Sequence, residues 1–410
     1  MPGVSSAQQR ITRLASLTAV HRAFHWLHLH QPQLRKWQLE MVRIPAPSFG
    51  ESERAAWFLD RFRQLGLANP HLDKEGNALA ELPSMRQDLS APPVVLLSAH
   101  LDTVFPPGTD CEPIEAEEDN RIYAPGICDN AAGLTGLLAI ASALRYAGIV
   151  PPVPVLFAAN VGEEGEGDLR GMRHLFEQGS YRHRIAAAIV LEGGGTSTAV
   201  TRALGSVRLR ITINGPGGHS WADAGSPNPI LILSRILSTI ADLPLPGAPL
   251  TTLNIGHISG GTSINSIPET ATALLDLRSA SPEHLAQTDA AVRDVCHQTV
   301  AKEKKAKHTC RIVIENIGNR PAATLAEDSS ILQTLHAIDR HLSLRTEERL
   351  GSTDANIPIS LNIPALALGT GGTGGGIHTL QEWYDPTGRE TALRRILLTL
   401  LDTIHVAAGE

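Results

Sequence analysis

Four short apolar segments, each followed by glycine, acidic or histidine residues, constrain this chain more than any other feature of its sequence. They span residues 93–99, 153–159, 186–191 and 364–368. Continuous apolar runs of this length are typical of strands buried on both faces of a sheet. Helical patterns lie between them, most clearly at 130–145, which is apolar nearly all round and is followed by Gly148 and Pro151. Strands alternating with helices predict an α/β fold with a mostly parallel sheet.

The middle of the chain follows a different pattern. We expect strands at 207–214, 251–258, 270–278 and 311–316, and helices at 229–243 and 282–302. This order is βαββαβ, a ferredoxin-like unit of roughly 110 residues. Because the first pattern resumes after Pro321, we predict an inserted lid or dimerisation domain, with linkers near 203–206 and 317–322. The predicted domains are 205–318 for the insertion, and 1–204 with 319–410 for the α/β domain.

Charge and hydropathy exclude two classes of partner. The chain has 35 Lys and Arg against 42 Asp and Glu, a formal net charge of −7, which argues against binding to nucleic acid or an anionic membrane. The best candidate for a membrane helix, 146–162, contains three prolines, so we expect no membrane span. Near the start, Arg10 and Arg13 precede an apolar patch at 14–20, which we interpret as an amphipathic first helix rather than a signal peptide.

The cysteines suggest a reducing compartment. They stand at 111, 128, 296 and 310, without C-x-x-C spacing, and so resemble neither a disulfide framework nor a structural zinc site. Cys128, beside Asp129, is expected to be a small packing residue. We therefore expect a cytoplasmic protein.

Each predicted buried strand leads to candidate metal ligands. The residues are His100 and Asp102 after the first strand, Glu163 and Glu164 after the second, Glu192 after the third, His378 after the glycine-rich segment that follows the fourth, and Asp129 at the start of the most apolar helix. Because the carboxyl ends of parallel strands line one crevice, these side chains should converge. Crowded carboxylates raise one another's pKa, and a pair of divalent cations relieves that repulsion. Imidazoles with carboxylates suit zinc, with cobalt or manganese as substitutes.

Taken singly, each of these residues has an ordinary structural explanation. A lone histidine in a chain with 17 of them is usually a surface or core residue. A Glu-Glu pair commonly starts a solvated helix, and an Asp-Asn pair commonly caps one. The glycine-rich segment 369–376 lacks the Lys-Ser/Thr that follows a phosphate-binding loop. It is the joint placement at strand ends that favours a metal centre.

Seven motifs in this order resemble those of the co-catalytic zinc hydrolases, the family of peptidase T, carboxypeptidase G, aminoacylase and succinyl-diaminopimelate desuccinylase. The motifs are HLDTV at 100–104, GICDNAAG at 126–133, NVGEEGEGD at 160–168, LEGGG at 191–195, GPGGHS at 215–220, NSIPE at 265–269 and GGIHT at 375–379. The resemblance extends from about residue 38 to 385. It implies that 1–204 and 319–410 form the catalytic domain of a zinc metallopeptidase or amidohydrolase.

The resemblance also implies a ligand set for two zinc ions per chain. Asp129 bridges the two ions, His100 and Glu192 complete one site, and Glu164 and His378 complete the other. Two zinc ions at such a site activate a shared water and polarise the scissile carbonyl.

Two further carboxylates have implied roles beside the metals. Asp102 orients the imidazole of His100. Glu163 acts as the general base, taking a proton from the water and passing it to the leaving amine. Family members also commonly have a cis peptide after the bridging aspartate, here between Asp129 and Asn130.

The inserted domain supplies a second set of residues. In the family the residue matching His219 stabilises the oxyanion, often in the active site of the other subunit, which implies a homodimer through this domain. Asn265 matches an asparagine that contacts substrate, and Arg278 matches an arginine that meets a substrate carboxylate. Each has an ordinary alternative: Gly-Gly-His is also a common turn, and Asn265 is able to cap the segment 264–268.

Three functions remain open from the sequence. Glu192 is typical of the carboxypeptidases and deacylases of the family. Asn356, in GSTDAN, is a candidate substrate-binding residue. It stands where deacylases have a substrate-binding arginine, whose charge-assisted contact is worth about 1.5–3 kcal/mol. The long glycine loop and HTLQEW resemble peptidase T. We therefore predict an exopeptidase acting on short peptides, with an N-acyl amino acid deacylase as the alternative. A metal-binding protein without turnover is disfavoured because Glu163 and His219 are both present.

Overall fold

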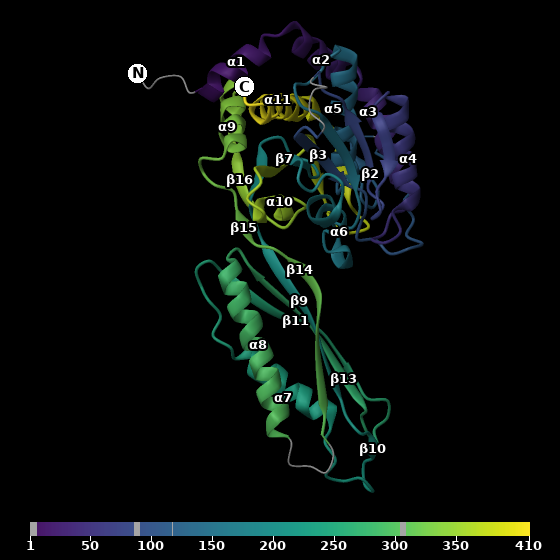
Figure 1. The fold of residues 1–410 in the computed structure, drawn as a ribbon. Coiled ribbons are helices and arrows are strands. Elements are labelled where there is room, and N and C mark those ends of the chain that lie inside the picture. Colours follow the sequence, from purple (N-terminus) through teal and green to yellow (C-terminus); the bar gives the residue numbers. More distant parts are fainter. Residues whose placement is uncertain (1–5, 86–90, 117, 304–308) are drawn as a thin grey trace. The chain divides into compact units, whose positions relative to one another are not determined.

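The computed structural model describes residues 6–85, 91–116, 118–303 and 309–410. It divides into two compact units, one formed by Met1–Arg202 with Thr324–Glu410 and the other by Ala203–Ala323. Figure 1 shows the course of the chain through both. Within the described ranges, no helix combines the length and the hydrophobicity needed to cross a bilayer.

The first unit is built on a nine-stranded sheet with the order β1-β2-β6-β3-β7-β17-β8-β15, in which β16 also pairs with β8. Four neighbouring strands at its centre run parallel: β6 (Val155–Asn160), β3 (Val94–His100), β7 (Ile185–Leu191) and β17 (Ala365–Leu368). They are almost entirely buried. The outer strands are β1 (Ala68–Leu72), β2 (Ala78–Leu82), β8 (Thr198–Ala203), β15 (Ala323–Thr324) and β16 (Glu347–Gly351). The predicted α/β class with a mostly parallel sheet is confirmed.

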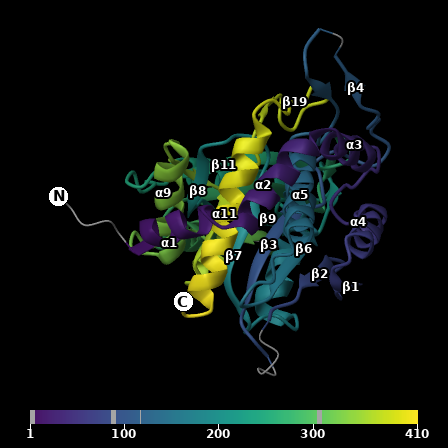
Figure 2. The same cartoon turned by 90° about the horizontal axis from the view of Figure 1, so that it is seen from above.

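Helices cover this sheet in layers. They are α1 (Ser6–Ala15), α2 (Thr18–Leu29), α3 (Gln31–Val42), α4 (Ser52–Gln64), α5 (Ala131–Ala147), α6 (Arg170–Arg173), α9 (Ser330–Leu342), α10 (Asn356–Ser360) and α11 (Arg389–Ala407). α5 and α11 pack against β3 and β7, and α2 packs against both helices (Figure 2). Because α5 lies between the sheet and the outer helices α2 and α3, it is apolar nearly all round.

The predicted amphipathic first helix is present as α1, whose residues Ala7, Ile11 and Leu14 are buried. The apolar patch 14–20 does not lie in one helix, because α1 ends at Ala15 and α2 begins at Thr18. The hydroxyl of Ser16 donates to the carbonyl of Arg13 at 2.7 Å, a local bond that competes with continuation of the helix. The Asp-Asn pair at 129–130 does cap a helix, because Asn130 is the N-cap of α5.

The side chain of Asn130 forms hydrogen bonds to the start of α5 and to the loop after β7. Its side-chain oxygen accepts the N–H groups of Gly133 at 3.1 Å and Gly193 at 3.0 Å. Its amide nitrogen donates to the carbonyl of Leu191 at 2.9 Å. Since Asn130 caps the helix, the carboxylate of Asp129 is left to face the strand ends.

A small antiparallel sheet, which the sequence did not predict, joins distant segments. Its order is β18 (Thr373–Gly375), β19 (Trp383–Asp385), β5 (Ile122–Tyr123) and β4 (Ile114–Glu115). The buried thiol of Cys128 packs on Gly374, where a Cβ atom would lie 2.4 Å from its Sγ. Cys128 is therefore a packing residue, as predicted, and all four cysteines are free.

The second unit has a four-stranded antiparallel sheet with two helices on one face. Its elements are β9 (Gly205–Asn214), β10 (Gly218–His219), α7 (Pro229–Ala241), β11 (Thr251–Gly260), β12 (Ser266–Ile267), β13 (Thr270–Ser279), α8 (Pro282–Lys302) and β14 (Arg311–Arg320). The sheet order is β11-β13-β9-β14, while β10 and β12 form a separate ribbon. Alternate residues of β9 and β13 pack against α7 and α8 in one apolar cluster. Apart from the ribbon, the element order is the βαββαβ of the sequence pattern.

Candidate metal centre

Five side chains meet at the carboxyl ends of the parallel strands. His100 is the last residue of β3, Glu192 follows β7, and Glu164 follows β6 by four residues. Asp129 immediately precedes the N-cap of α5, and its peptide bond to Asn130 is cis. His378 comes from the loop between β18 and β19.

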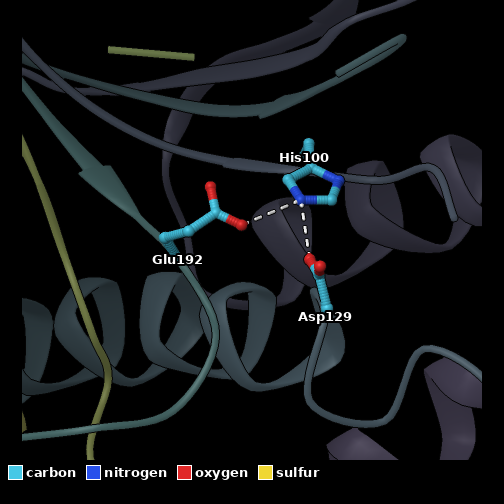
Figure 3. Close-up of side chains that lie close together, drawn as sticks. All are labelled: His100, Asp129 and Glu192. Carbon is cyan, nitrogen blue, oxygen red and sulfur yellow. Dashed lines mark hydrogen bonds and ion pairs between the residues drawn. The ribbon is translucent and has the colours of Figure 1, made fainter. Parts of the chain in front are cut away.

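Asp129 lies between two histidines. Nε2 of His100 is 3.2 Å from Oδ1 of Asp129 and 3.2 Å from Oε1 of Glu192 (Figure 3). Nε2 of His378 is 3.2 Å from the other oxygen of Asp129, Oδ2, and 3.1 Å from Oε1 of Glu164. The carboxylate of Asp129 thus gives one oxygen to each of two His-Asp-Glu triads.

The spacing of these atoms fits a divalent cation in each triad. Ligand atoms placed about 2.0–2.1 Å from a tetrahedral zinc ion lie about 3.3 Å from one another. Nδ1 of His100 is 3.0 Å from the backbone carbonyl of Asp102, which only accepts, so Nδ1 carries a proton and donates it. In the neutral ring, Nε2 then directs its lone pair at two carboxylate oxygens, an arrangement that a cation between them stabilises.

The surroundings of Glu192 also support a divalent cation in its triad. Its Oε2 is buried and has no hydrogen-bond partner among the described residues, which is unusual for a native carboxylate. Burial raises the pKa of Glu192 to about 7, although the charge of His100 opposes this shift. A nitrogen and oxygen donor set of this kind suits zinc, cobalt or manganese.

In the metal-free protein the two histidines hold their protons strongly. Burial lowers the pKa of His100, but the carboxylates around it, Glu192 first, raise it well above the ordinary value. Hydrogen bonds to Asp129 and Glu164 raise the pKa of His378 to about 10. A proton and a cation therefore compete for the same atoms.

The backbone at His378 is held in an uncommon conformation. Its φ is 64°, in the left-handed region that few residues other than glycine adopt, at a cost of about 1–3 kcal/mol. The carbonyl of Gly376 accepts the N–H and the hydroxyl of Thr379, at 2.9 and 2.7 Å. Pairing of β18 with β19 fixes both ends of the loop, so the ring is presented in a defined place.

Asp102 organises the two strand ends beside the centre. Its buried carboxylate accepts the hydroxyl of Ser48 at 2.7 Å and the N–H groups of Glu163 and Glu164 at 2.9 Å each. Glu163 is itself buried, and one of its oxygens lies within 4.8 Å of ligand atoms of His100 and Glu164. The carboxylate of Asp102 therefore fixes the turn that carries Glu163, while its backbone carbonyl holds the His100 ring.

Sequence reasoning missed the residue that fixes the Asp129 turn. The carboxylate of Glu382 is fully buried and accepts the N–H groups of Gly126 at 3.1 Å, Cys128 at 2.9 Å and Asp129 at 2.8 Å. Burial raises its pKa to about 7, and the three N–H groups oppose that shift. The sequence feature that could have indicated Glu382 is its position four residues after His378, in HTLQEW.

In the second unit, the β10–β12 ribbon brings two predicted site residues together. The N–H of Ser220 donates to the carbonyl of Asn265 at 3.0 Å, beside His219. Nδ1 of His219 accepts the N–H groups of Trp221 at 3.2 Å and Ala222 at 3.3 Å. The ring proton is therefore on Nε2, which makes Nε2 of this exposed side chain a donor.

Arg278 and Asn356, the other two predicted substrate-binding residues, form hydrogen bonds within the chain. Arg278 lies eight residues along β13 from Thr270, about 26 Å from the end nearer the ribbon, and its Nε donates to Asp276 at 2.6 Å. Asn356 begins α10, is fully buried, and accepts the N–H of Thr353 at 3.0 Å. A substrate contact of either residue stays a prediction.

The fold and the two triads define an α/β protein with a candidate dinuclear metal centre. The sequence model of peptidase family M20/M25/M40 matches residues 96–404, and the chain belongs to this family. The family resemblance inferred from the motifs is confirmed.

Individual relatives agree with this assignment. A probable carboxypeptidase of Talaromyces marneffei is 28% identical over 211 residues, covering 46% of each chain. An acetylornithine deacetylase of Myxococcus xanthus is 29% identical over 203 residues, 44% of this chain and 50% of its own. The chain thus spans about half the length of these curated relatives. The structure of a Staphylococcus aureus tripeptidase has the same fold, with a TM-score of 0.72, 22% identity, and coverage of 92% of this chain and 98% of its own.

Proposed function

We propose that this protein is a dinuclear zinc hydrolase that cleaves amide bonds of short peptides as an exopeptidase. The observation that carries the proposal is the carboxylate of Asp129, whose two oxygens each face a separate His-Glu pair. Two zinc ions, when bound, would polarise the scissile carbonyl and lower the pKa of a water toward neutrality. Cobalt and manganese are chemical substitutes.

Glu163 is the proposed general base. Its carboxylate is buried beside His100 and Glu164 without belonging to either Asp129 triad. It accepts a proton from the attacking water and passes it to the leaving amine. Asp102 is a positioning residue, because its carboxylate holds the backbone of Glu163 and its backbone carbonyl accepts from the ring of His100.

His219 is the proposed oxyanion donor. Its Nε2–H is available because Nδ1 already accepts two backbone N–H groups. Asn265, on the same ribbon, is a proposed substrate contact, and Arg278 is a proposed partner for a substrate carboxylate. A homodimer formed through the second unit would let His219 serve the partner's centre.

A deacylase of N-acyl amino acids is the second candidate. Glu192 favours it, as does the similarity to the acetylornithine deacetylase of Myxococcus xanthus. Asn356 opposes it, because a buried amide that caps a turn does not replace an arginine that binds a carboxylate. The carboxypeptidase and tripeptidase relatives support the peptidase.

Substrate screening of zinc-loaded protein tests the two candidates. We expect hydrolysis of di- and tripeptides, without hydrolysis of acetyl- or succinyl-amino acids. Hydrolysis of acetyl- or succinyl-amino acids alone would make the protein a deacylase. No hydrolysis of either class would leave a metal-binding protein without turnover and refute the proposal.

We also propose a cytoplasmic location. The four free thiols support a reducing compartment. Fractionation of cells that express the full-length protein tests this, and recovery in an oxidising compartment would contradict it.

A further inference from the structure

Four histidines on the outside of the first unit share one hollow. His21, His25 and His28 come from α2, and His341 comes from the last turn of α9. The hollow has a volume of about 490 Å³, and no residue of the metal centre lines it. Four of the 17 histidines in the chain thus gather at one surface site.

The three histidines on α2 occupy one face of the helix. Their spacings of four and three residues place them within an arc of about 60°, with neighbouring Cβ atoms about 5–6 Å apart. All three are exposed. Two histidines four residues apart on a helix are able to bind one metal ion together. His25 therefore has a histidine neighbour one turn away on each side, and each neighbouring pair is spaced closely enough to share one metal ion.

The orientation of His28 provides an independent observation. Its Nδ1 is 2.8 Å from Oε2 of Glu390, and Arg394 binds the same carboxylate. A carboxylate that accepts from Nδ1 leaves Nε2 with a free lone pair, as in the carboxylate–histidine–metal arrangement. Arg394 also lies over the ring of Phe24, at 5.2 Å, on the wall of the hollow. Its pairing with Glu390 offsets the charge that would repel a cation.

We propose that this hollow binds one late transition-metal ion, such as Zn²⁺, Ni²⁺ or Cu²⁺, through the imidazoles of His25 and His28, with His21 and His341 of the same hollow as candidate further ligands. Imidazole nitrogens favour these ions over Mg²⁺ and Ca²⁺, which prefer oxygen ligands. The site is separate from the Asp129 centre and does not depend on the proposed hydrolase activity. The chain therefore binds one equivalent of such metals beyond those in the centre.

Isothermal titration of the full-length, untagged and metal-stripped protein with Ni²⁺ tests the site. The double variant His21→Ala/His25→Ala should bind one equivalent fewer than the wild type. The matched control His183→Ala/His297→Ala removes two exposed histidines elsewhere and should bind as many equivalents as the wild type. Cu²⁺ bound in the hollow should show nitrogen hyperfine structure in its electron paramagnetic resonance spectrum.

Two further variants separate this site from the centre. Glu390→Gln should lower the affinity for the extra metal ion by about 10–100-fold, because His28 loses its orienting carboxylate. Asp129→Ala, which disrupts the centre, should retain the extra equivalent. The proposal is overturned if His21→Ala/His25→Ala binds as many equivalents as the wild type, or if the control loses the same equivalent. Either result leaves the proposed hydrolase function untouched.

Discussion

Replacement of Glu382 by glutamine tests whether a buried carboxylate preorganises the Asp129 turn. Oε1 of Glu382 accepts the N–H groups of Cys128 and Asp129, and Oε2 accepts the N–H of Gly126. In Glu382→Gln we expect the amide oxygen to take the position of Oε1, where it accepts the N–H groups of Cys128 and Asp129. The new NH₂ group then faces the N–H of Gly126, so one bond becomes a contact between two donors.

The expected cost follows from these three bonds. The lost charge-assisted bond is worth about 1.5–3 kcal/mol, and the remaining two become neutral and weaker. Because Asp129 contributes to both triads, part of this cost should appear as weaker metal binding. We expect metal affinity to fall by about 10–100-fold, the range typical for residues that support metal ligands.

Competition with a chromogenic chelator measures this affinity in wild type and variant. Asp402→Asn is the matched control, because Asp402 is also a fully buried carboxylate but is held by Arg10 and Thr334. The control should lose stability and keep its metal affinity. Unchanged metal affinity in Glu382→Gln, or an equal loss in the control, would refute the role of Glu382.

Three further predictions concern the centre and its chemistry. Glu163→Gln should retain two zinc ions per chain by metal analysis but lose hydrolysis of every substrate, since the amide accepts no proton. His219→Ala should lower kcat by at least about 100-fold, and mixing it with Glu163→Gln should restore part of the activity only if His219 acts across a subunit interface. Metal binding should release protons, because the metal-free pKa of His378 is raised to about 10 and that of Glu192 to about 7. Apparent metal affinity should therefore rise with pH from 6 toward 10, and calorimetric heats should depend on the buffer's ionisation enthalpy.

Each of these predictions has a contradicting result. Turnover by Glu163→Gln would remove Glu163 from the role of base. A small change in kcat for His219→Ala would exclude it as the oxyanion donor. Metal affinity that does not change with pH would show that His378 and Glu192 carry no proton before the metal binds.

The sequence was informative wherever an element is long or buried on both faces. The apolar runs that became β3, β6, β7 and β17 were visible because parallel strands bury both faces, so their pattern does not depend on distant partners. His100 and Glu192 were visible because they stand directly at the ends of β3 and β7. Glu164 and His378 follow their strands at a greater distance, and Asp129 stands at the start of α5, so their motifs were needed to identify them.

Features that depend on tertiary contacts were not visible in the sequence. The two- and three-residue strands β4, β5, β18 and β19 are too short to carry a periodic pattern. The role of Glu382 exists only because the chain returns to residues 126–129 after more than 250 positions. The burial of Asn356 was likewise not visible in the sequence, because it is set by the packing of α10.

The central claim is that Asp129 shares its carboxylate between two metal ions. Anomalous diffraction at the zinc absorption edge, from crystals of the zinc-loaded protein, tests it most directly. We predict two peaks on either side of Asp129, one beside His100 and Glu192 and the other beside Glu164 and His378. A single peak, or peaks that do not contact Asp129, would contradict the account.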